Sequence, residues 1–374
     1  MDVQTAREAV VAAGLKLVES GLIARTWGNV SCRIDDKRFV ITPSGLAYES
    51  LKPEDIVVVG IDDLEYEGDI KPSSEKGVHA QVYKLKPHIQ FVIHTHQTNA
   101  SVAGILGRDV EIAAETAKSL IGSRAVLADY GLPGTKKLQN NVTKALSRSD
   151  SRAVLMRNHG ALCFGESSEV AFDVAMALEE ECSRLVAAAH NTNSAGLGFS
   201  CRKDGLCVFN KGDTKVQIEI LTGKAINNKP ISAEAALHLA VYRVRRDINV
   251  IKGSVLPYTQ SASGAKVKPL LDDFAQIIGV SVRSVQWDQS DASKFRVVGA
   301  LSGRNAVLLS GFGALCCAGT EDDATAVEMI LEKGCMTHLS AAAAHRLKPI
   351  AFVECLLMRK VYQLKYSKKS QQKQ

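Results

Sequence analysis

Several features are scarce in this sequence, and each scarcity limits what the protein can be. Aromatic residues make up 5% of the 374 residues, which argues against a nucleic-acid binder that stacks bases on aromatic rings. The net charge is +6, but Lys and Arg are scattered along the chain. The only dense basic run is the C-terminal stretch 365–374, which we interpret as a disordered, solvated end. We therefore expect no nucleic-acid partner.

Membrane and secretion signals are also missing. No apolar run approaches the ~20 residues that a membrane-spanning helix needs. The stretch 1–21 carries charges throughout and has apolar residues at helical spacing, which predicts an amphipathic helix and not a signal peptide. The nine cysteines form no Cys-x-x-Cys pair, and their apolar contexts favour buried free thiols in a reducing compartment. We expect a cytoplasmic protein with no membrane partner.

What the sequence does contain is an internal duplication. A length of 374 residues already suggests two domains. The segments 153–163, 73–89 and 31–33 recur as 306–316, 232–248 and 200–202. We predict a first domain over 1–190 and a second over 191–365, with 191–198 as their junction and 366–374 as a tail.

The residue pattern of each copy mixes strands and helices. In the first copy it predicts strands at 40–42, 56–59, 91–93 and 154–156, and helices at 4–20, 75–86, 135–147 and 167–189. This mixture predicts an α/β or α+β layered domain, in which helices cover a central sheet.

Three histidines stand at the ends of apolar runs in the first copy. His94 and His96 close the run 89–93, and His159 follows the run 153–156. Side chains alternate along a strand, so residues two apart face the same way. A third imidazole from a neighbouring strand would complete a three-histidine site with an open position, as in catalytic zinc sites. The alternative is that these are unrelated polar residues at strand ends.

The second copy bears on this choice. Gly253, Val255 and Phe312 stand opposite the three histidines, while the flanking core pattern persists. The joint loss of all three histidines is what a dismantled metal site would look like. We predict that the second copy folds like the first but binds no metal.

Three loops rich in small residues accompany the histidines, at 26–31, 42–45 and 72–75. They offer unobstructed backbone N–H groups, and serines at a helix N-terminus favour anion binding. Together they suggest a phosphate pocket; taken singly, each could be an ordinary turn or cap. Glu75 could cap the helix or act as general base or acid beside a metal. Its counterpart Glu234, retained without histidines, supports a partly structural role.

Two more residues of the first copy have open roles. Tyr130 precedes a Pro-Gly turn and could deliver a proton or be a half-buried packing residue. His79 recurs as His238 in the copy without histidine ligands, which favours a packed core histidine over a metal ligand.

Six motifs of the first copy resemble, in the same order along the chain, those of the class II aldolase/adducin-head family, in its L-fuculose-1-phosphate aldolase branch. They are Thr-Trp-Gly-Asn-Val-Ser (26–31), Thr-Pro-Ser-Gly (42–45), Ser-Ser-Glu (73–75), His-Thr-His (94–96), Tyr-x-x-x-Gly-Thr (130–135) and Asn-His-Gly (158–160). The resemblance implies a mainly antiparallel central sheet covered by helices. It also implies that Glu75 is the catalytic acid/base and that Tyr130 assists the aldehyde oxygen. The implied zinc ligands are His94, His96 and His159, and the implied phosphate-binding residues are Gly28, Asn29, Ser44, Gly45, Ser73 and Ser74.

The function implied is a zinc-dependent aldolase, a carbon–carbon lyase that cleaves or forms a sugar phosphate through a metal-stabilised enediolate of dihydroxyacetone phosphate. In the related ribulose-phosphate 4-epimerases the residue at the position of Glu75 is typically Asp. The Glu in this chain therefore favours aldol chemistry. Three alternatives stay open: another reaction at the same site (epimerase, decarboxylase or dehydratase), another divalent metal, and a non-catalytic adducin-like scaffold.

The family also suggests an assembly. Its enzymes are usually tetramers whose sites a neighbour's C-terminal tail closes. Since the first copy has no such tail, we predict that the second copy is a built-in neighbour and that a homodimer mimics the tetramer. Tyr362 or Tyr366 would then close the site.

Overall fold

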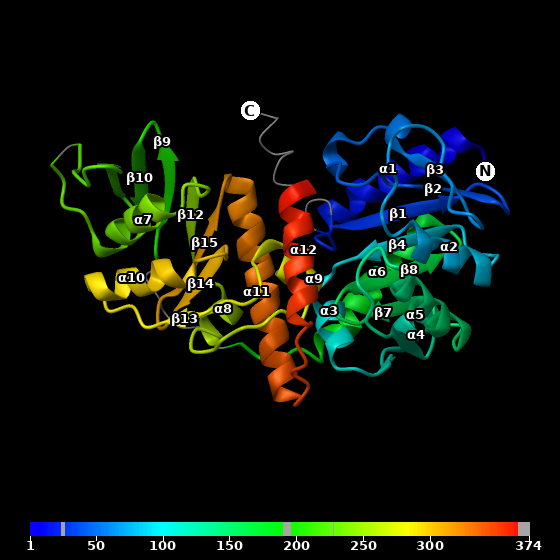
Figure 1. The fold of residues 1–374 in the computed structure, drawn as a ribbon. Helices are drawn as coiled ribbons and strands as arrows, with labels where there is room; N and C mark the ends of the chain where they lie inside the picture. Colours follow the sequence, from blue (N-terminus) through cyan, green and yellow to red (C-terminus); the bar gives the residue numbers. More distant parts are fainter. Residues whose placement is uncertain (24–26, 190–195, 227, 366–374) are drawn as a thin grey trace. The chain divides into compact units, whose positions relative to one another are not determined.

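The structure is a computed structural model that describes residues 1–23, 27–189, 196–226 and 228–365. The chain divides into two compact units, Met1–Val186 and Ala187–Gln374. Both are mixed α/β layers in which helices cover a sheet (Figure 1). The predicted junction at 191–198 falls largely outside the described residues, as does the whole tail at 366–374.

The first unit is built on an eight-stranded sheet of order β3-β2-β1-β4-β8-β7-β6-β5. All neighbouring strands are antiparallel except the pair β6 and β7. The strands are β1 (Gly28–Arg33), β2 (Arg38–Ile41), β3 (Val57–Gly60), β4 (Phe91–Thr95), β5 (Val110–Glu111), β6 (Arg124–Ala128), β7 (Ala153–Met156) and β8 (Gly160–Gly165). The expected mainly antiparallel sheet is confirmed.

Helices cover both faces of this sheet. They are α1 (Val3–Glu19), α2 (Lys76–Leu85), α3 (Thr98–Ile105), α4 (Glu115–Ile121), α5 (Lys136–Ser147) and α6 (Ser168–Ser183), with short 3₁₀ turns at Tyr48–Ser50 and Pro53–Asp55. One core packs α1, α3, α4 and α6 against the sheet, and the other packs α2 and α5. Alternation along β4 divides its residues between them, Ile93 facing the first core and Val92 the second.

Two details of the first unit differ from the sequence-based expectation. Residues 28–31 belong to strand β1 and not to a loop, because this segment pairs with both β2 and β4 and buries Val30. Helix α6 ends at Ser183 and not at 189. Leu185 and Val186 make short turn hydrogen bonds, and the Ala187 N–H donates to Ser340 Oγ instead of to a helix carbonyl.

The second unit repeats the arrangement with seven strands in the order β11-β10-β9-β12-β15-β14-β13. The strands are β9 (Phe199–Lys203), β10 (Leu206–Lys211), β11 (Thr214–Glu219), β12 (Val250–Ser254), β13 (Ser284–Val285), β14 (Ala306–Leu309) and β15 (Gly313–Ala318). The helices are α7 (Ala233–Val244), α8 (Pro257–Ser261), α9 (Asp272–Ile277), α10 (Asp291–Ala300), α11 (Glu321–Ala343) and α12 (Phe352–Lys365).

The strand register fixes which residues of the two units correspond. His94 pairs with Leu162 between β4 and β8, and Gly253 pairs with Leu315 between β12 and β15. Leu162 and Leu315 occupy the same place in the repeated sequence run, so Gly253 takes the place of His94. The duplication read from the sequence is thus also present in the sheets.

Two expectations from composition can be compared with the structure. All nine cysteines are free, and all but Cys201 are buried. Within the described residues, no helix is both long and apolar enough to cross a membrane.

Candidate metal centre

Three strands bring the three histidines together. His94 lies within β4, His96 just beyond its end, and His159 in the tight turn between β7 and β8. Since β8 lies beside β4, the turn reaches the end of β4. Gly160 permits this approach, because a Cβ there would lie only 2.2 Å from the Thr95 carbonyl oxygen.

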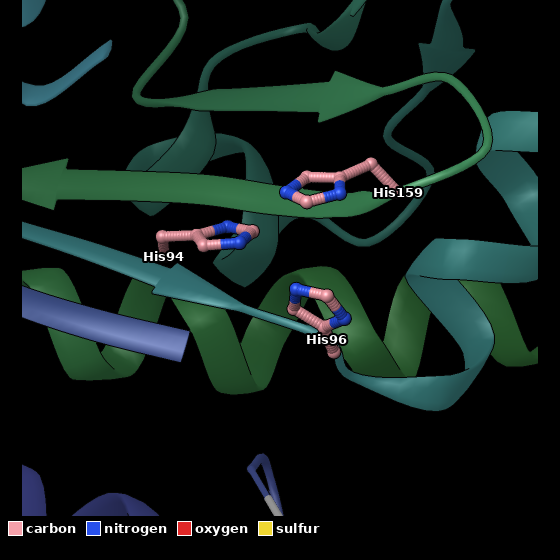
Figure 2. Close-up of side chains that lie close together, drawn as sticks. All are labelled: His94, His96 and His159. Atoms are coloured by element: carbon pink, nitrogen blue, oxygen red, sulfur yellow. The ribbon is translucent and has the colours of Figure 1, made fainter. Parts of the chain in front are cut away.

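The three imidazole rings form a compact cluster (Figure 2). One ring nitrogen from each histidine lies within 4.8 Å of the other two. The ring centroids are 4.7 to 4.9 Å apart. His94 and His159 are buried and His96 is half-buried. This donor set fits one divalent ion, because zinc takes three histidine nitrogens at about 2.0–2.1 Å and keeps a further position open.

A hydrogen bond fixes the orientation of the His94 ring. Its Nδ1 lies 2.9 Å from the carbonyl oxygen of Ala161 on β8. A carbonyl can only accept, so Nδ1 carries a proton, and Nε2 is the atom left to face the cluster. Fixing the tautomer of a histidine ligand in this way is typical of metal sites in proteins.

Glu75 faces the imidazoles and does not cap helix α2. Its side chain makes no capping hydrogen bond. Its two carboxylate oxygens lie 3.0 Å from His94 Nε2 and 2.8 Å from His159 Nε2. Burial opposes ionisation, but the charges and hydrogen bonds of His159 and His94 hold the pKa of Glu75 well below its usual range. The carboxylate is therefore ionised and points at the atoms that would hold a metal.

The three small-residue segments meet beside this cluster. A β-bridge joins Pro43 and Pro72, and the Ser73 N–H donates to the Thr42 carbonyl. The Thr42 hydroxyl accepts from the Val30 N–H, which ties the second segment to β1. The candidate phosphate-binding residues Gly28, Asn29, Ser44, Gly45, Ser73 and Ser74 are thus placed on adjoining segments of one unit. Their role as a phosphate pocket stays a prediction.

Tyr130 lies in the loop that follows β6. Asn141 of helix α5 donates to its backbone carbonyl, and its side chain is half-buried. Further along this loop, a Cβ on Gly134 would lie 3.4 Å from Ser74 Cβ. The loop thus borders the segment that carries Ser73 and Ser74, and the role of the phenol stays a prediction.

A buried chain of hydrogen bonds lies behind Glu75 and is not predicted by the sequence pattern. Asn29 Nδ2 donates to Glu75 Oε2 at 3.2 Å, and Asn29 Oδ1 lies 2.5 Å from His79 Nε2. Ser31 Oγ lies 2.7 Å from His79 Nδ1 and 2.7 Å from the Tyr83 hydroxyl. His79 is indeed a packed core histidine outside the metal cluster, yet it contacts the site through Asn29.

In the second unit the same place has a different chemistry. Phe312, opposite His159, packs against the ring of Trp287 with centroids 5.0 Å apart. Glu234 is retained, and Lys211 Nζ lies 2.8 Å from its Oε1. Lys211 thus pairs with Glu234, whose counterpart Glu75 faces two imidazoles in the first unit.

Comparison with known proteins finds related sequences. The family model for the class II aldolase and adducin N-terminal domain matches residues 8–186 and 205–339. A 5-deoxy-D-ribulose 1-phosphate aldolase of Bacillus thuringiensis serovar kurstaki is 36% identical over 180 residues, 48% of this chain and 83% of that protein. An L-ribulose-5-phosphate 4-epimerase, UlaF, of Salmonella paratyphi B is 30% identical over 204 residues, 51% of this chain and 88% of that protein.

Solved structures match about half of the chain, which is the length of one unit. An L-fuculose 1-phosphate aldolase is 32% identical, with a TM-score of 0.45, over 48% of this chain and 84% of that chain. The L-fuculose-1-phosphate aldolase of Thermus thermophilus is 27% identical, with a TM-score of 0.42, over 48% of this chain and 92% of that chain. With family-model matches in both units, the chain belongs to the class II aldolase and adducin N-terminal domain family.

Proposed function

We propose that the first unit is a zinc-dependent aldolase that cleaves or forms a sugar phosphate, releasing or consuming dihydroxyacetone phosphate. The observation that carries this proposal is the position of Glu75, an ionised buried carboxylate held 3.0 and 2.8 Å from the Nε2 atoms of His94 and His159. A scaffold has no need for a buried carboxylate aimed at two of three clustered imidazoles, since burying such groups is costly.

The metal would be held by His94, His96 and His159, whose nitrogens have a suitable spacing. When bound, zinc would supply Lewis acidity, polarising substrate oxygens and offsetting the negative charge that develops on them. Zinc is the metal that most often takes three histidines and an open position in enzymes. Other divalent ions of similar size remain alternatives at imidazole sites.

In the direction of synthesis, Glu75 would remove a proton from the carbon beside the ketone of dihydroxyacetone phosphate. The electron pair left on that carbon attacks the aldehyde carbon, and the new carbon–carbon bond leaves an alkoxide. Tyr130 would give that alkoxide its proton. The N–H and hydroxyl groups around Ser44 and Ser73 would fix the phosphate. Cleavage runs through the same steps in reverse.

A second candidate is epimerisation of a pentulose phosphate at the same site, because UlaF, which is 30% identical to this chain, is named as such an epimerase. The glutamate at position 75 favours the aldolase, since the family resemblance implies aspartate there in ribulose-phosphate epimerases.

The test is a screen of zinc-loaded protein against ketose 1-phosphates, with release of dihydroxyacetone phosphate measured by a coupled reductase. His94→Ala is the matched control and should release none. Interconversion of pentulose 5-phosphates without release would favour the epimerase. Native protein that takes up no metal would overturn both candidates.

The predicted homodimer and the cytoplasmic location stay predictions. Of the two tyrosines proposed to close the site, Tyr366 lies outside the described residues. Tyr362 lies in helix α12, whose Cys355, Met358 and Arg359 are buried. Truncation before this helix would remove part of the second unit's core, so Tyr362→Phe is the cleaner test. Unchanged turnover in that variant would exclude a role for its hydroxyl group.

A further inference from the structure

The buried chain behind Glu75 has a defined direction. Asn29 Nδ2 donates to Glu75 Oε2, which leaves Asn29 Oδ1 as the atom facing His79 Nε2 at 2.5 Å. An amide oxygen can only accept, so His79 must carry its proton on Nε2. Its Nδ1 is then an acceptor, and the Ser31 hydroxyl donates to it at 2.7 Å.

The rest of the chain agrees with this direction. Ser31 has used its only proton on His79, so its oxygen accepts from the Tyr83 hydroxyl 2.7 Å away. Asn29, Ser31, His79 and Tyr83 are all buried, so water does not compete for these bonds. Burial and the nearby charge of His94 also lower the pKa of His79 to about 3, which agrees with one proton on the ring.

The second unit retains half of this chain. Ser200 Oγ lies 2.8 Å from His238 Nδ1 and 2.9 Å from the Tyr242 hydroxyl. Asn29 is replaced by Gly198, whose carbonyl bonds to the Gly253 N–H. His238 Nε2 is buried, and among the described residues no side chain accepts a hydrogen bond from it. A histidine at this position, His79 or His238, is therefore common to both units. Among the described residues, its Nε2 makes a side-chain hydrogen bond only in the first unit, which holds the cluster of His94, His96 and His159.

We propose that His79, with its proton on Nε2, is a positioning residue that fixes the Asn29 carboxamide so that Nδ2 points at Glu75, next to the candidate phosphate-binding residues Ser73 and Ser74. This inference rests on the proposed function for its catalytic consequence. Without the Nε2 donor, the amide could turn its oxygen toward the carboxylate, and the site would lose a donor to a charged group. Such a hydrogen bond corresponds to about a ten- to hundredfold change in an equilibrium or rate.

Four variants separate positioning from packing. In His79→Gln the amide nitrogen takes the place of Nε2 and can still donate to Asn29. In His79→Asn the shorter side chain takes the place of Nδ1, and that donor is lost. His238→Gln and His238→Asn make the same changes in the second unit, where glycine stands in place of the asparagine. They report the cost of the substitution to packing alone.

We expect His79→Asn to lower kcat/KM about ten- to hundredfold and His79→Gln to lose no more than about fivefold. Both His238 variants should keep native kcat/KM, and their thermal shifts should report the cost of each substitution to packing. Zinc content should be native in all four. Equal losses in the two His79 variants, or a matching loss in the His238 variants, would overturn the positioning role.

Two readouts do not depend on turnover. The ¹⁵N spectrum of the native protein, with His79 assigned by through-bond correlation, should show the Nε2–H tautomer; an Nδ1–H tautomer overturns the proposal even if the variants do not fold. Titration with inorganic phosphate should show weaker binding to His79→Asn than to His79→Gln, and equal affinities would contradict the proposal. Native zinc-loaded protein that cleaves no sugar phosphate would instead contradict the proposed function, while these two readouts still decide the orientation of Asn29.

Discussion

The two sheets of this molecule share a strand order from β3 to β6 in one unit and from β11 to β13 in the other, yet they hold different groups at the same place. In the first, Glu75 faces the nitrogens of His94 and His159. In the second, Glu234 pairs with Lys211, and Phe312, packed against Trp287, stands in the place of His159. The fold alone therefore does not require the imidazoles.

The comparison separates residues that hold the fold from residues that make the site. Arg33 donates to the carbonyls of Ile89 and Tyr83, and Arg202 donates in the same way to Ile248 and Tyr242. Such shared contacts bind the helix to the sheet in both units. The contacts of Glu75 with His94, His159 and Asn29 occur in the first unit only, so function is to be sought there.

The largest expected effect comes from giving the first unit the second unit's residue. His159→Phe removes one of three candidate ligands and inserts an apolar ring. Metal content should fall from about one ion per chain to near zero. Turnover should fall by at least about a thousandfold. Metal analysis and the coupled assay measure both. Phe312→His is the reciprocal control, and its metal content should not rise because Gly253 and Val255 supply no ligands.

Glu75→Gln should lower turnover about a hundred- to ten-thousandfold while metal stays bound, because the amide keeps the shape but cannot take a proton. Glu234→Gln, the matched change, should leave turnover unchanged. It should cost no more than about 1 kcal/mol of unfolding free energy, since its pair with Lys211 is partly exposed. Turnover rates and denaturant titrations measure the two effects. Full activity in Glu75→Gln would end the proposed role of Glu75.

Tyr130→Phe tests a smaller contribution, the delivery of a proton to the alkoxide. Turnover should fall about a hundredfold with little change in stability. Trp287→Phe is the counterpart in the second unit, where strand register places Trp287 opposite Tyr130. That change should leave turnover as it is. If both variants are fully active, Tyr130 is a packing residue.

The smallest effect concerns a feature that both units share. Burial lowers the pKa of both His238 and His79 to about 3 in the folded protein. In the unfolded chain, a histidine binds a proton below about pH 6.5. The unfolded state then holds more protons, so stability is lost as pH falls from about 6.5 to about 3. The slope is about 1.4 kcal/mol per pH unit for each histidine. Urea titrations should show this slope reduced by one proton in His238→Gln; an unchanged slope would contradict the buried neutral state.

Much of the first unit could be predicted from sequence because local patterns and tertiary structure agree there. The apolar runs before His94 and His159 are strands β4 and β7, and the predicted helix at 135–147 is α5. The three histidines could be grouped because strand alternation and the duplication pointed the same way.

The parts that sequence reasoning missed depend on partners distant in the chain. Residues 28–31 have the small side chains of a loop, and only pairing with both β2 and β4 makes them a strand. Asn29 could be recognised as a site residue, but its contact with His79 arises from β1 and α2 packing together, 50 residues apart. The duplication holds one signal of this contact. The second copy keeps the histidine, as His238, but has Gly198 in place of Asn29.

Each chain should hold one metal site, in the first unit. The most direct test is the metal content of purified full-length protein after incubation with zinc and removal of excess ion. We expect about one tightly bound zinc per native chain and none in His94→Ala. No bound zinc in the native protein, or two ions per chain, would show that the site is not where we place it.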